Sequence, residues 1–307
     1  MTTHIKIGTR NSALALWQAH WIGSKLKRVG LSYELVAISS KGDQILDRSL
    51  SKIGSKGVFT EELEEMLRNG EIHIAQHSAK DLPSDLPKDL SLIAFTEREL
   101  PHDVLLSIDP NFDISQASKK IIGTSSTRRR AMMSHYYPQH DLVDMRGNLQ
   151  TRLEKLKNGA CDAMLLAYAG VHRMEMQHFI VKHFNVSEFT PAVGQGSVAV
   201  QAAANLDKKL IELIRSACNH EETEECLLAE RQVLKMLDGG CSVPVYGHAW
   251  KQNNVIHLKA GVFSLQGDQH IKTEASGMEA IDLGNSVAKT LQEAGANDLL
   301  QKIKSEL

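Results

Sequence analysis

The sequence predicts an α/β protein with two similar lobes, a central cleft between them and a smaller C-terminal α+β domain. Three observations support this fold class. Strand-like and helix-like segments alternate over residues 4–202, the alternation restarts after a polar stretch at 97–102, and from Asn219 onward one helix is followed by three consecutive strand patterns. Such alternation is typical of a mostly parallel sheet, which binds ligands beyond the carboxyl ends of its strands. Two such lobes joined by two crossings form a hinged cleft.

The first lobe begins with a strand at 4–9, followed by a helix that Ser12 caps and that ends near Gly30. A second helix is capped by Thr60, carries two glutamates in its first turn, as the helix macrodipole favours, and is closed by Gly70. The remaining strand patterns of this lobe are apolar or alternating runs at 33–39, 72–77 and 90–96.

The second lobe contains strand patterns at 104–108, 121–125, 142–145 and 163–167, with helices at 128–136 and 148–158 between them. Residues 190–196 lead back to a strand at 198–202, so the chain crosses between the lobes twice. The sequence therefore predicts three domains, formed by residues 1–98 together with 196–217, by residues 99–195, and by residues 218–307.

The last domain begins with a long helix that runs to Leu237 and is expected to be capped by Asn219, with Glu222 three residues on. Strand patterns at 243–251, 255–264 and 271–275 follow, joined by turn-like residues. One amphipathic helix at 279–304 completes an α+β domain.

Composition excludes several classes of protein. A formal net charge of −2 over 307 residues, with 5% aromatic residues, argues against a nucleic-acid binder. The four cysteines form no CxxC pair, so they indicate neither a disulfide framework nor a zinc site. The N-terminus runs directly into a strand without an apolar signal core, and no segment reaches transmembrane length, so we expect a cytoplasmic protein.

A strand, a short polar turn, an arginine and a helix recur three times, at Arg10, at Arg128 to Arg130, and at Arg146 with Arg152. Helix N-termini with hydroxyl side chains and bidentate guanidinium groups bind carboxylates or phosphates. For any one of these arginines taken alone, an ordinary solvated side chain is the better interpretation. Three at the carboxyl ends of strands predict one cleft that binds several anionic groups, which Lys56, Lys80 and Arg173 could join.

Two further residues are candidates for chemistry. Cys241 follows Gly239 and Gly240 and precedes Pro244, so it can be presented on a short loop, although a small buried hydrophobic residue is the alternative. Asp81 lies just after the strand at 72–77, in a cleft that is expected to be rich in cations. There it would stay ionised and could hold a positive charge that develops on a substrate. An ordinary aspartate turn is the alternative. We interpret Cys161, Cys218 and Cys226 as structural, and His73 and His77 as packing residues.

These motifs occur together in one order. They are Gly8-Thr9-Arg10, Ser55-Lys56-Gly57, His77-Ser78-Ala79-Lys80-Asp81, Gly123-Thr124-Ser125-Ser126 with Arg128-Arg129, Arg146-Gly147-Asn148, Pro191-Ala192-Val193-Gly194-Gln195-Gly196 and Gly239-Gly240-Cys241. In this order they resemble the hydroxymethylbilane synthase family, also called porphobilinogen deaminases, over nearly the whole chain. The resemblance implies two lobes similar to type II periplasmic binding proteins and a third domain that holds the cofactor.

The resemblance also implies a reaction and a set of roles. A dipyrromethane joined to Cys241 by a thioether would be elongated by four porphobilinogen molecules, with loss of ammonia at each step, and the linear tetrapyrrole would then be released by hydrolysis. Asp81 would be the catalytic carboxylate and would also bind the cofactor by hydrogen-bonding pyrrole N–H groups. Cofactor carboxylates would be held by Lys80, Ser126, Arg128, Arg129 and Arg146, and the substrate or growing chain by Arg10, Ser12, Lys56, Arg146, Arg152, Arg173 and Gln195. A monomer without metal is implied.

Departures from the family pattern affect affinity more than reaction type. Lys41 stands where the family commonly has arginine, which keeps the charge but loses the bidentate fork. Two other functions stay open from the residues alone. One is a binding protein for a small carboxylate in which Cys241 is inert, and the other is an acyl transferase that uses Cys241 as its nucleophile and needs a nearby histidine base.

Overall fold

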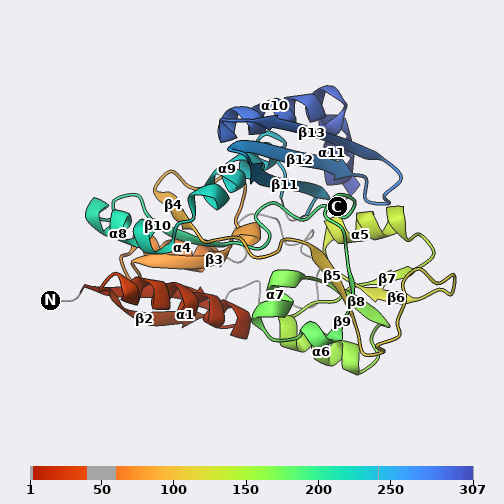
Figure 1. The fold of residues 1–307 in the computed structure, drawn as a ribbon, viewed down its shortest axis with the longest axis horizontal. Helices are drawn as coiled ribbons and strands as arrows, with labels where there is room; N and C mark the ends of the chain where they lie inside the picture. The colour runs from red at the N-terminus through yellow and green to blue at the C-terminus, as the bar shows by residue number, and fades with distance from the viewer. Residues whose placement is uncertain (1–2, 40–59, 241, 307) are drawn as a thin grey trace.

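The computed structural model describes residues 3–39, 60–240 and 242–306, and these ranges contain three β-sheets. Figure 1 shows two sheets side by side in the lower half of the view and the third above them. The two lower sheets have five strands each and the upper one has three. Two α/β lobes and a smaller α+β unit are therefore confirmed.

The first lobe is built on a sheet with strand order β2-β1-β3-β10-β4. Strand β1 (His4–Arg10) pairs in parallel with β2 (Ser32–Ile38) and β3 (Ile74–Ser78). Strand β10 (Val198–Ala203) runs antiparallel between β3 and β4 (Leu90–Phe95). The expectation of a mostly parallel sheet is therefore confirmed, and β10 is the one antiparallel strand among those described, because it arrives from the other lobe and enters the sheet from the opposite end.

Three described helices accompany this sheet: α1 (Ala13–Arg28), α4 (Glu61–Arg68) and α8 (Lys208–Cys218). Ile22 and Leu26 of α1 and Ile214 of α8 are fully buried and share one core cluster with the strand residues Ile5 and Ile7. The sequence patterns did not predict α8. The side chain of Thr60 makes no capping hydrogen bond to α4, which corrects that expectation.

The second lobe repeats this arrangement with strand order β7-β6-β8-β5-β9. Its strands are β5 (Asp103–Ser107), β6 (Ile121–Gly123), β7 (Asp141–Val143), β8 (Ala163–Ala167) and β9 (Ile180–His183). Strand β6 is parallel to β7 and β8, whereas β5 is antiparallel to β8 and β9. In both sheets the antiparallel strand, β5 or β10, is the one that the chain enters directly from a crossing. The helices are α5 (Thr127–Tyr136), α6 (Leu149–Lys157) and α7 (Tyr168–Arg173).

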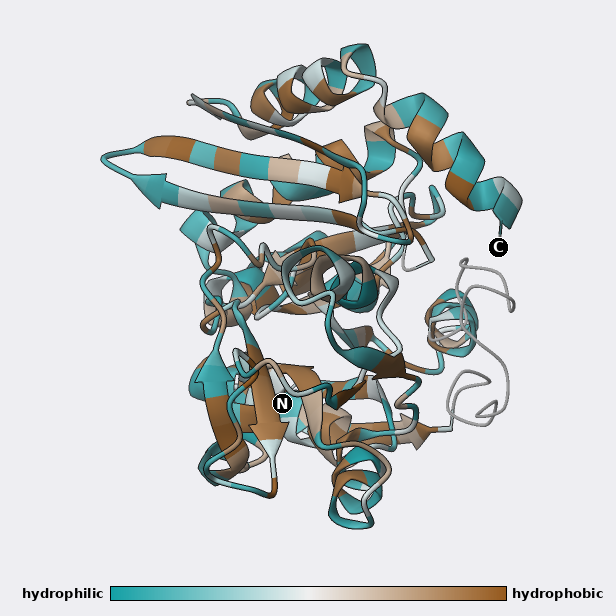
Figure 2. Ribbon diagram, turned by 90° about the vertical axis from the view of Figure 1, so that its right-hand side faces the viewer, coloured by the Kyte–Doolittle hydropathy of each residue, from teal (hydrophilic) through white to brown (hydrophobic). Residues whose placement is uncertain are grey.

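The third unit begins with α9 (Glu221–Met236) and continues through β11 (Val245–Gln252), β12 (Val255–Phe263) and β13 (His270–Gly277) to α10 (Ala280–Glu293) and α11 (Ala296–Glu306). Polar and apolar residues alternate along the long strands of its antiparallel sheet (Figure 2). The apolar residues Ile256 and Leu258 of β12 are fully buried in one cluster with Val233 of α9 and Leu291 of α10.

Two expectations for this unit were wrong. The cap of α9 is His220, whose ring accepts a hydrogen bond from the Thr223 N–H, because the Asn219 side chain instead accepts from the Phe95 N–H and donates to Glu224. The single helix expected at 279–304 is two helices, since the chain bends at Gly295, where φ is +93°.

One buried carboxylate holds both crossings between the lobes. Glu230 of α9 accepts hydrogen bonds from Arg98 on the first crossing, with Nη1 at 2.5 Å, and from the Gly194 N–H on the second, at 2.8 Å. It also accepts from the Ala249 N–H of β11, and Arg98 donates through Nε to the Gln195 carbonyl. Both connections between the lobes are therefore anchored in the third unit.

Candidate functional site

Two adjoining cavities lie between the lobes, and the larger one extends to the third unit. The smaller, of about 220 Å³, is lined by residues of both lobes, which include Arg10, Ser12, Gln18, Ser78, Asn148, Arg173 and Ser197. The larger, of about 400 Å³, is lined by both lobes and the third unit, with Ser126, Arg128, Gln195, Asp238, Gly239, Gly240 and Ser242 among its residues. Four residues line both cavities: Lys80, Asp81, Arg129 and Arg152. Asp81 is the only acid of these four, and it lies where the two cavities adjoin.

The turn that carries Asp81 is fixed by close packing. Strand β3 ends at Ser78, and residues Ala79–Asp81 form one turn of 3₁₀ helix. Gly194 of the second crossing has φ +74°, and a Cβ on it would lie 2.9 Å from the Ala79 carbonyl carbon and 3.0 Å from the Lys80 nitrogen. Only glycine allows this approach. The return crossing therefore holds the catalytic candidate and its neighbouring lysine from behind.

Lys80 is a cation whose charge is poised near neutral pH. Burial, helped by the nearby Arg129, lowers its pKa from 10.5 to about 8, while Asp81 and Asp103 oppose the change. An anion bound beside Lys80 would favour its protonated form. The side chain therefore suits a carboxylate ligand that enters the cleft.

The predicted helix N-termini are present. Ser12 caps α1 by accepting from the Ala15 N–H at 3.3 Å, Ser126 caps α5 by accepting from the Arg129 N–H at 3.4 Å, and Asn148 caps α6 by accepting from the Thr151 N–H at 2.9 Å. All three residues line one of the two cavities. The serine hydroxyls keep a hydrogen to donate, so they can bind an anion while they cap.

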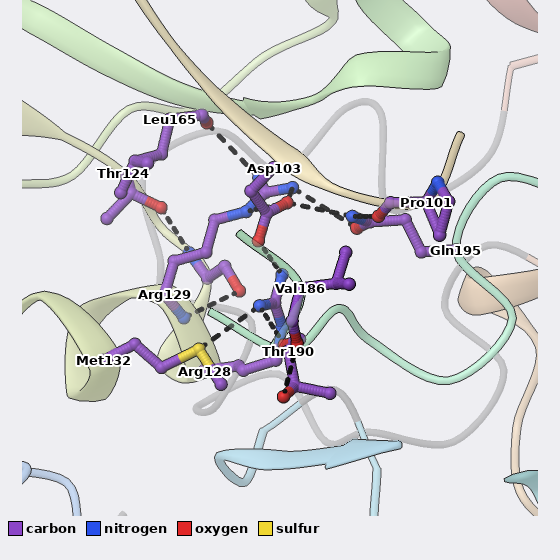
Figure 3. A network of polar contacts seen from close by, with 11 residues as sticks. Pro101, Asp103, Thr124, Arg128, Arg129, Met132, Leu165, Val186, Thr190 and Gln195 are labelled. Atoms are coloured by element: carbon purple, nitrogen blue, oxygen red, sulfur yellow. Dashed lines mark hydrogen bonds and ion pairs between the residues drawn. The ribbon is translucent and has the colours of Figure 1, made fainter. Parts of the chain in front are cut away.

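Arg128 and Arg129 share a buried carboxylate that the sequence patterns did not reveal (Figure 3). Asp103, at the start of β5, is fully buried and accepts from Arg128 Nη2 at 2.6 Å and from Arg129 Nη2 at 2.7 Å. Gln195 Nε2 donates to the same carboxylate at 2.9 Å. Burial alone would raise the pKa of Asp103, but the two guanidinium groups outweigh it and hold that pKa well below its usual range.

The pair of arginines carries more positive charge than Asp103 neutralises, although most of its donors already have acceptors in the protein. Arg128 also donates to the Thr190 carbonyl and Arg129 to the Leu165 carbonyl. In the part of the chain that the structure describes, the buried Nε of Arg128 has no hydrogen-bond partner. Two guanidiniums against one carboxylate leave a net charge of +1 beside the larger cavity, and such a group attracts anions.

The remaining arginines are spread along the cleft. Arg152 donates through Nε to the Gly147 carbonyl at 2.7 Å, and Arg173 donates to the Gly196 carbonyl at 2.8 Å. Burial lowers the pKa of each to about 10, so both stay charged at neutral pH. Arg146 lies close enough to lower the pKa of Arg152, but it does not line either cavity; its buried Nη1 has no partner among the described residues.

The four cysteines fall into two groups. Cys241 and Lys56, and also Lys41, lie outside the described residues, but Gly239, Gly240 and Ser242, which flank Cys241, line the larger cavity. Cys161, Cys218 and Cys226 are buried, and burial raises their pKa values to about 11, 12 and 12. Such thiols are poor nucleophiles, in agreement with the structural role expected for them.

His77 is buried and bonded to Gln201 at 3.0 Å, and burial lowers its pKa to about 4, as a packing role requires. Within the described ranges no three His, Cys, Asp or Glu side chains come together as metal ligands. None of the described helices is long and apolar enough to cross a membrane.

Sequence reasoning missed three polar residues that shape this site. Asp103 was overlooked because it directly precedes an apolar strand, although a cleft with so many arginines required a buried counter-charge. Gln18 lines the smaller cavity from a helix taken as simply amphipathic, and it bonds to Ser78 and Gln76. Glu230 sits on the buried face of α9, and a glutamate on the apolar side of a helix was the signal available.

Known proteins match the chain along its length. The family model described as "Porphobilinogen deaminase, dipyromethane cofactor binding domain" matches residues 5–212, and "Porphobilinogen deaminase, C-terminal domain" matches residues 224–293. The porphobilinogen deaminase of Cytophaga hutchinsonii is 48% identical over 309 residues, covering 100% of this chain and 99% of that protein. That of Desulfosudis oleivorans is 47% identical over 305 residues, covering 98% of each.

Solved structures resemble the lobes only distantly. The periplasmic VFT2 domain of Bordetella pertussis BvgS is 15% identical, with a TM-score of 0.43, and the match covers 70% of this chain and 86% of that one. The second substrate binding domain of a putative amino acid ABC transporter from Streptococcus pneumoniae is 13% identical, with a TM-score of 0.44, over 70% and 91% of the two chains. Because these TM-scores are low, the fold assignment is based on the strand orders of the sheets and not on these structures.

Proposed function

The chain belongs to the porphobilinogen deaminase family and is a hydroxymethylbilane synthase, a transferase of tetrapyrrole biosynthesis; from this premise we propose which of its residues perform the reaction. Four porphobilinogen molecules are joined head to tail onto a dipyrromethane primer, each with release of ammonia, and hydrolysis then frees the linear tetrapyrrole. Every pyrrole unit carries an acetate and a propionate. The ligand of the cleft is therefore a polycarboxylate that gains negative charge at each step.

The donor set of the cleft fits such a group. Lys80, Arg129 and Arg152 line both cavities, and the larger cavity adds Ser126 and Arg128. The unpartnered Nε of Arg128 and Nη1 of Arg146 are donors that carboxylates can satisfy. A bound dipyrromethane would supply the nucleophilic pyrrole carbon to which the first substrate is joined. Guanidinium and ammonium groups bind its side-chain carboxylates and orient it.

Cys241 is the proposed attachment point, through a thioether. The support is indirect: its neighbours in the chain line the larger cavity, and the other three cysteines are buried with raised pKa values. The acyl-transfer alternative needs a histidine base near Cys241, and among the described residues no histidine lines either cavity.

Asp81 is the proposed catalytic carboxylate, and its position is the observation that carries the assignment. It lines both cavities, so it can face the primer end in one and the incoming substrate in the other. When ammonia leaves porphobilinogen, positive charge develops on the pyrrole ring and its N–H. A fixed carboxylate stabilises this charge without reorganisation.

The other site residues are assigned by the group that each is proposed to bind. We assign Lys80, Ser126, Arg128 and Arg129 to the cofactor. Arg10, Ser12, Arg152 and Arg173 are assigned to the substrate or growing chain, with Gln195 lining the larger cavity. Arg146 and Lys56 stay predictions in both respects. We further propose a cytoplasmic monomer, without nucleic-acid or membrane partners, whose three domains comprise residues 1–98 with 196–217, 99–195 and 218–307.

A non-catalytic protein that binds a small carboxylate is not favoured, because the matching family model is that of a cofactor-binding domain and the relatives match over their full length.

The decisive experiment is the intact mass of the purified protein beside its Cys241→Ala variant, followed by Ehrlich's aldehyde reagent. A mass excess of one dipyrromethane and a pyrrole colour in the wild type only would establish the attachment. A wild type without excess mass is first incubated with porphobilinogen to load incomplete protein. If the mass still does not change, the attachment to Cys241 is wrong.

A further inference from the structure

Helix α9 contacts the segment that carries Asp81 and also the residues that lead to Cys241. It lies between the first lobe and the C-terminal sheet (Figure 1), and the chain continues from its end at Met236 through Asp238 and Gly239 to Cys241. The turn after the helix folds back, because the Gly239 N–H donates to the Leu234 carbonyl at 2.9 Å. A Cβ on Gly239 would lie 2.8 Å from the Leu234 side chain. The last turns of α9 therefore support the loop that leads to Cys241.

The same turns of α9 hold the segment that follows Asp81. Arg231 Nη2 donates to the Pro83 carbonyl at 2.8 Å and approaches the Ser84 carbonyl at 3.5 Å. One turn later Lys235 pairs with Asp85 at 3.3 Å. One turn earlier Leu227 is fully buried in a cluster with Ala79 and Leu82, on either side of Asp81. Residues 79–85 thus lie along one face of α9.

Removing the charged guanidinium of Arg231 from water costs free energy, so its position calls for a structural reason. Burial lowers its pKa to about 10, with Asp85 partly opposing the shift, so the group is desolvated yet charged at neutral pH. Its partners in the first lobe are main-chain carbonyls, and a guanidinium that donates to fixed carbonyls constrains the backbone rather than another mobile side chain.

We infer that Arg231 is a positioning residue that fixes the Asp81 segment relative to the helix leading to Cys241. The Asp81 segment and the described residues up to Gly240 then move as one body, and opening of the hinge between the lobes changes the position of the second lobe's arginines around them. This inference rests on the proposed roles of Asp81 and Cys241.

The test compares Arg231→Leu and Arg231→Lys with Arg215→Leu in holoenzyme whose cofactor content is checked by intact mass. Arg215 is the matched control, because it also donates to a first-lobe carbonyl, that of Ile93 at 2.7 Å, and it contacts the start of α9 through Glu224. Amide hydrogen exchange of residues 79–86 is measured together with kcat and KM for porphobilinogen.

In Arg231→Leu we expect exchange in residues 79–86 to accelerate at least about tenfold, the effect of losing a hydrogen bond from a charged donor. A misplaced carboxylate lowers kcat about 10- to 100-fold with little change in KM. Arg231→Lys, which keeps the charge and one donor, should be intermediate in both measurements. Arg215→Leu should lower the melting temperature without changing either.

Unchanged exchange and unchanged kcat in both Arg231 variants would overturn the inference, as would a loss of kcat no larger than that of the control. If Arg231→Leu does not fold, Arg231→Lys decides alone, and wild-type kcat in it counts against positioning. A wild type that carries dipyrromethane and releases hydroxymethylbilane in the same assay shows that such a failure concerns Arg231 and not the proposed function.

Discussion

Glu230 accepts a hydrogen bond from the backbone N–H of Gly194 at 2.8 Å, although the two residues belong to different parts of the fold. The same carboxylate binds Arg98 of the other crossing, and it is fully buried. Burial alone would raise the pKa of Glu230, but Arg98 and His248 outweigh it and lower that pKa from 4.5 to about 2. Both connections between the lobes therefore depend on one ionised group.

Glu230→Gln should lower the free energy of unfolding by about 3 kcal/mol at pH 7, because Arg98 keeps its charge and loses its buried partner. The contribution of a carboxylate with a depressed pKa is complete above its unfolded value of 4.5 and is lost as the pH falls toward 2. Urea unfolding at pH 7 and pH 3 should therefore show a smaller difference from wild type at pH 3. Glu225 lies on the same helix as Glu230 and forms a partly exposed ion pair with Lys251 of β11. Glu225→Gln should therefore change the free energy of unfolding by less than about 1 kcal/mol. Equal effects of both variants would contradict this account.

Asp81→Asn should lower kcat about 100- to 1000-fold while the melting temperature stays near that of the wild type. Asparagine keeps the size of the side chain but removes the charge that stabilises the cation formed as ammonia leaves. Product formation from porphobilinogen measures the effect, and Asp109→Asn, at an exposed position of the second lobe that lines neither cavity, is the control. Near-normal turnover in Asp81→Asn would remove Asp81 from the mechanism.

Asp103→Asn should destabilise the fold by about 3 to 5 kcal/mol, since it leaves Arg128 and Arg129 buried without their counter-charge. Asp141→Asn in the same lobe, whose partner Lys119 is exposed, should cost less than about 1 kcal/mol. Chemical denaturation of the two variants separates these outcomes. A stable Asp103→Asn protein would mean that bound carboxylates, rather than Asp103, balance the two arginines.

Lys80→Arg should change the pH dependence of kcat/KM. In the wild type, the lowered pKa of about 8 makes Lys80 lose its charge as the pH rises from 7 to 9, and binding of carboxylates weakens with it. Arginine stays charged throughout this range. The decline above pH 8 should therefore be smaller in Lys80→Arg, and Lys88→Arg at an exposed position should retain the wild-type profile. Superimposable profiles of all three proteins would show that Lys80 does not control binding.

Local signals in the sequence were sufficient for the junctions that build the site. The structure confirms the cap predicted at Ser12, whose side chain satisfies a nearby helix N–H group, and the helices predicted at 128–136 and 148–158 begin at Thr127 and Leu149. The positions of Lys80 and Asp81 at the end of a strand follow in the same way, because a strand and the turn after it are encoded by neighbouring residues.

The features that were not predicted depend on residues far apart in the chain. Asn219 was expected to cap α9, but the Phe95 N–H, 124 residues away, competes for its side chain. The pairing of Asp103 with Arg128 spans 25 residues and two elements. The antiparallel position of β10 depends on where the return crossing enters the sheet. None of these leaves a periodic trace in the sequence.

The order of strands in the first lobe has a consequence for synthesis of the chain. Strand β10, which begins at Val198, lies between β3 and β4, although β4 ends at Phe95. A ribosome that adds about 5–20 residues per second makes the intervening residues in roughly 5 to 20 s. Throughout that time β3 and β4 lack the strand that joins them, whereas β5 to β9 appear consecutively and can complete their sheet. Of the two lobes, the one that is translated first is therefore the one whose sheet is completed last.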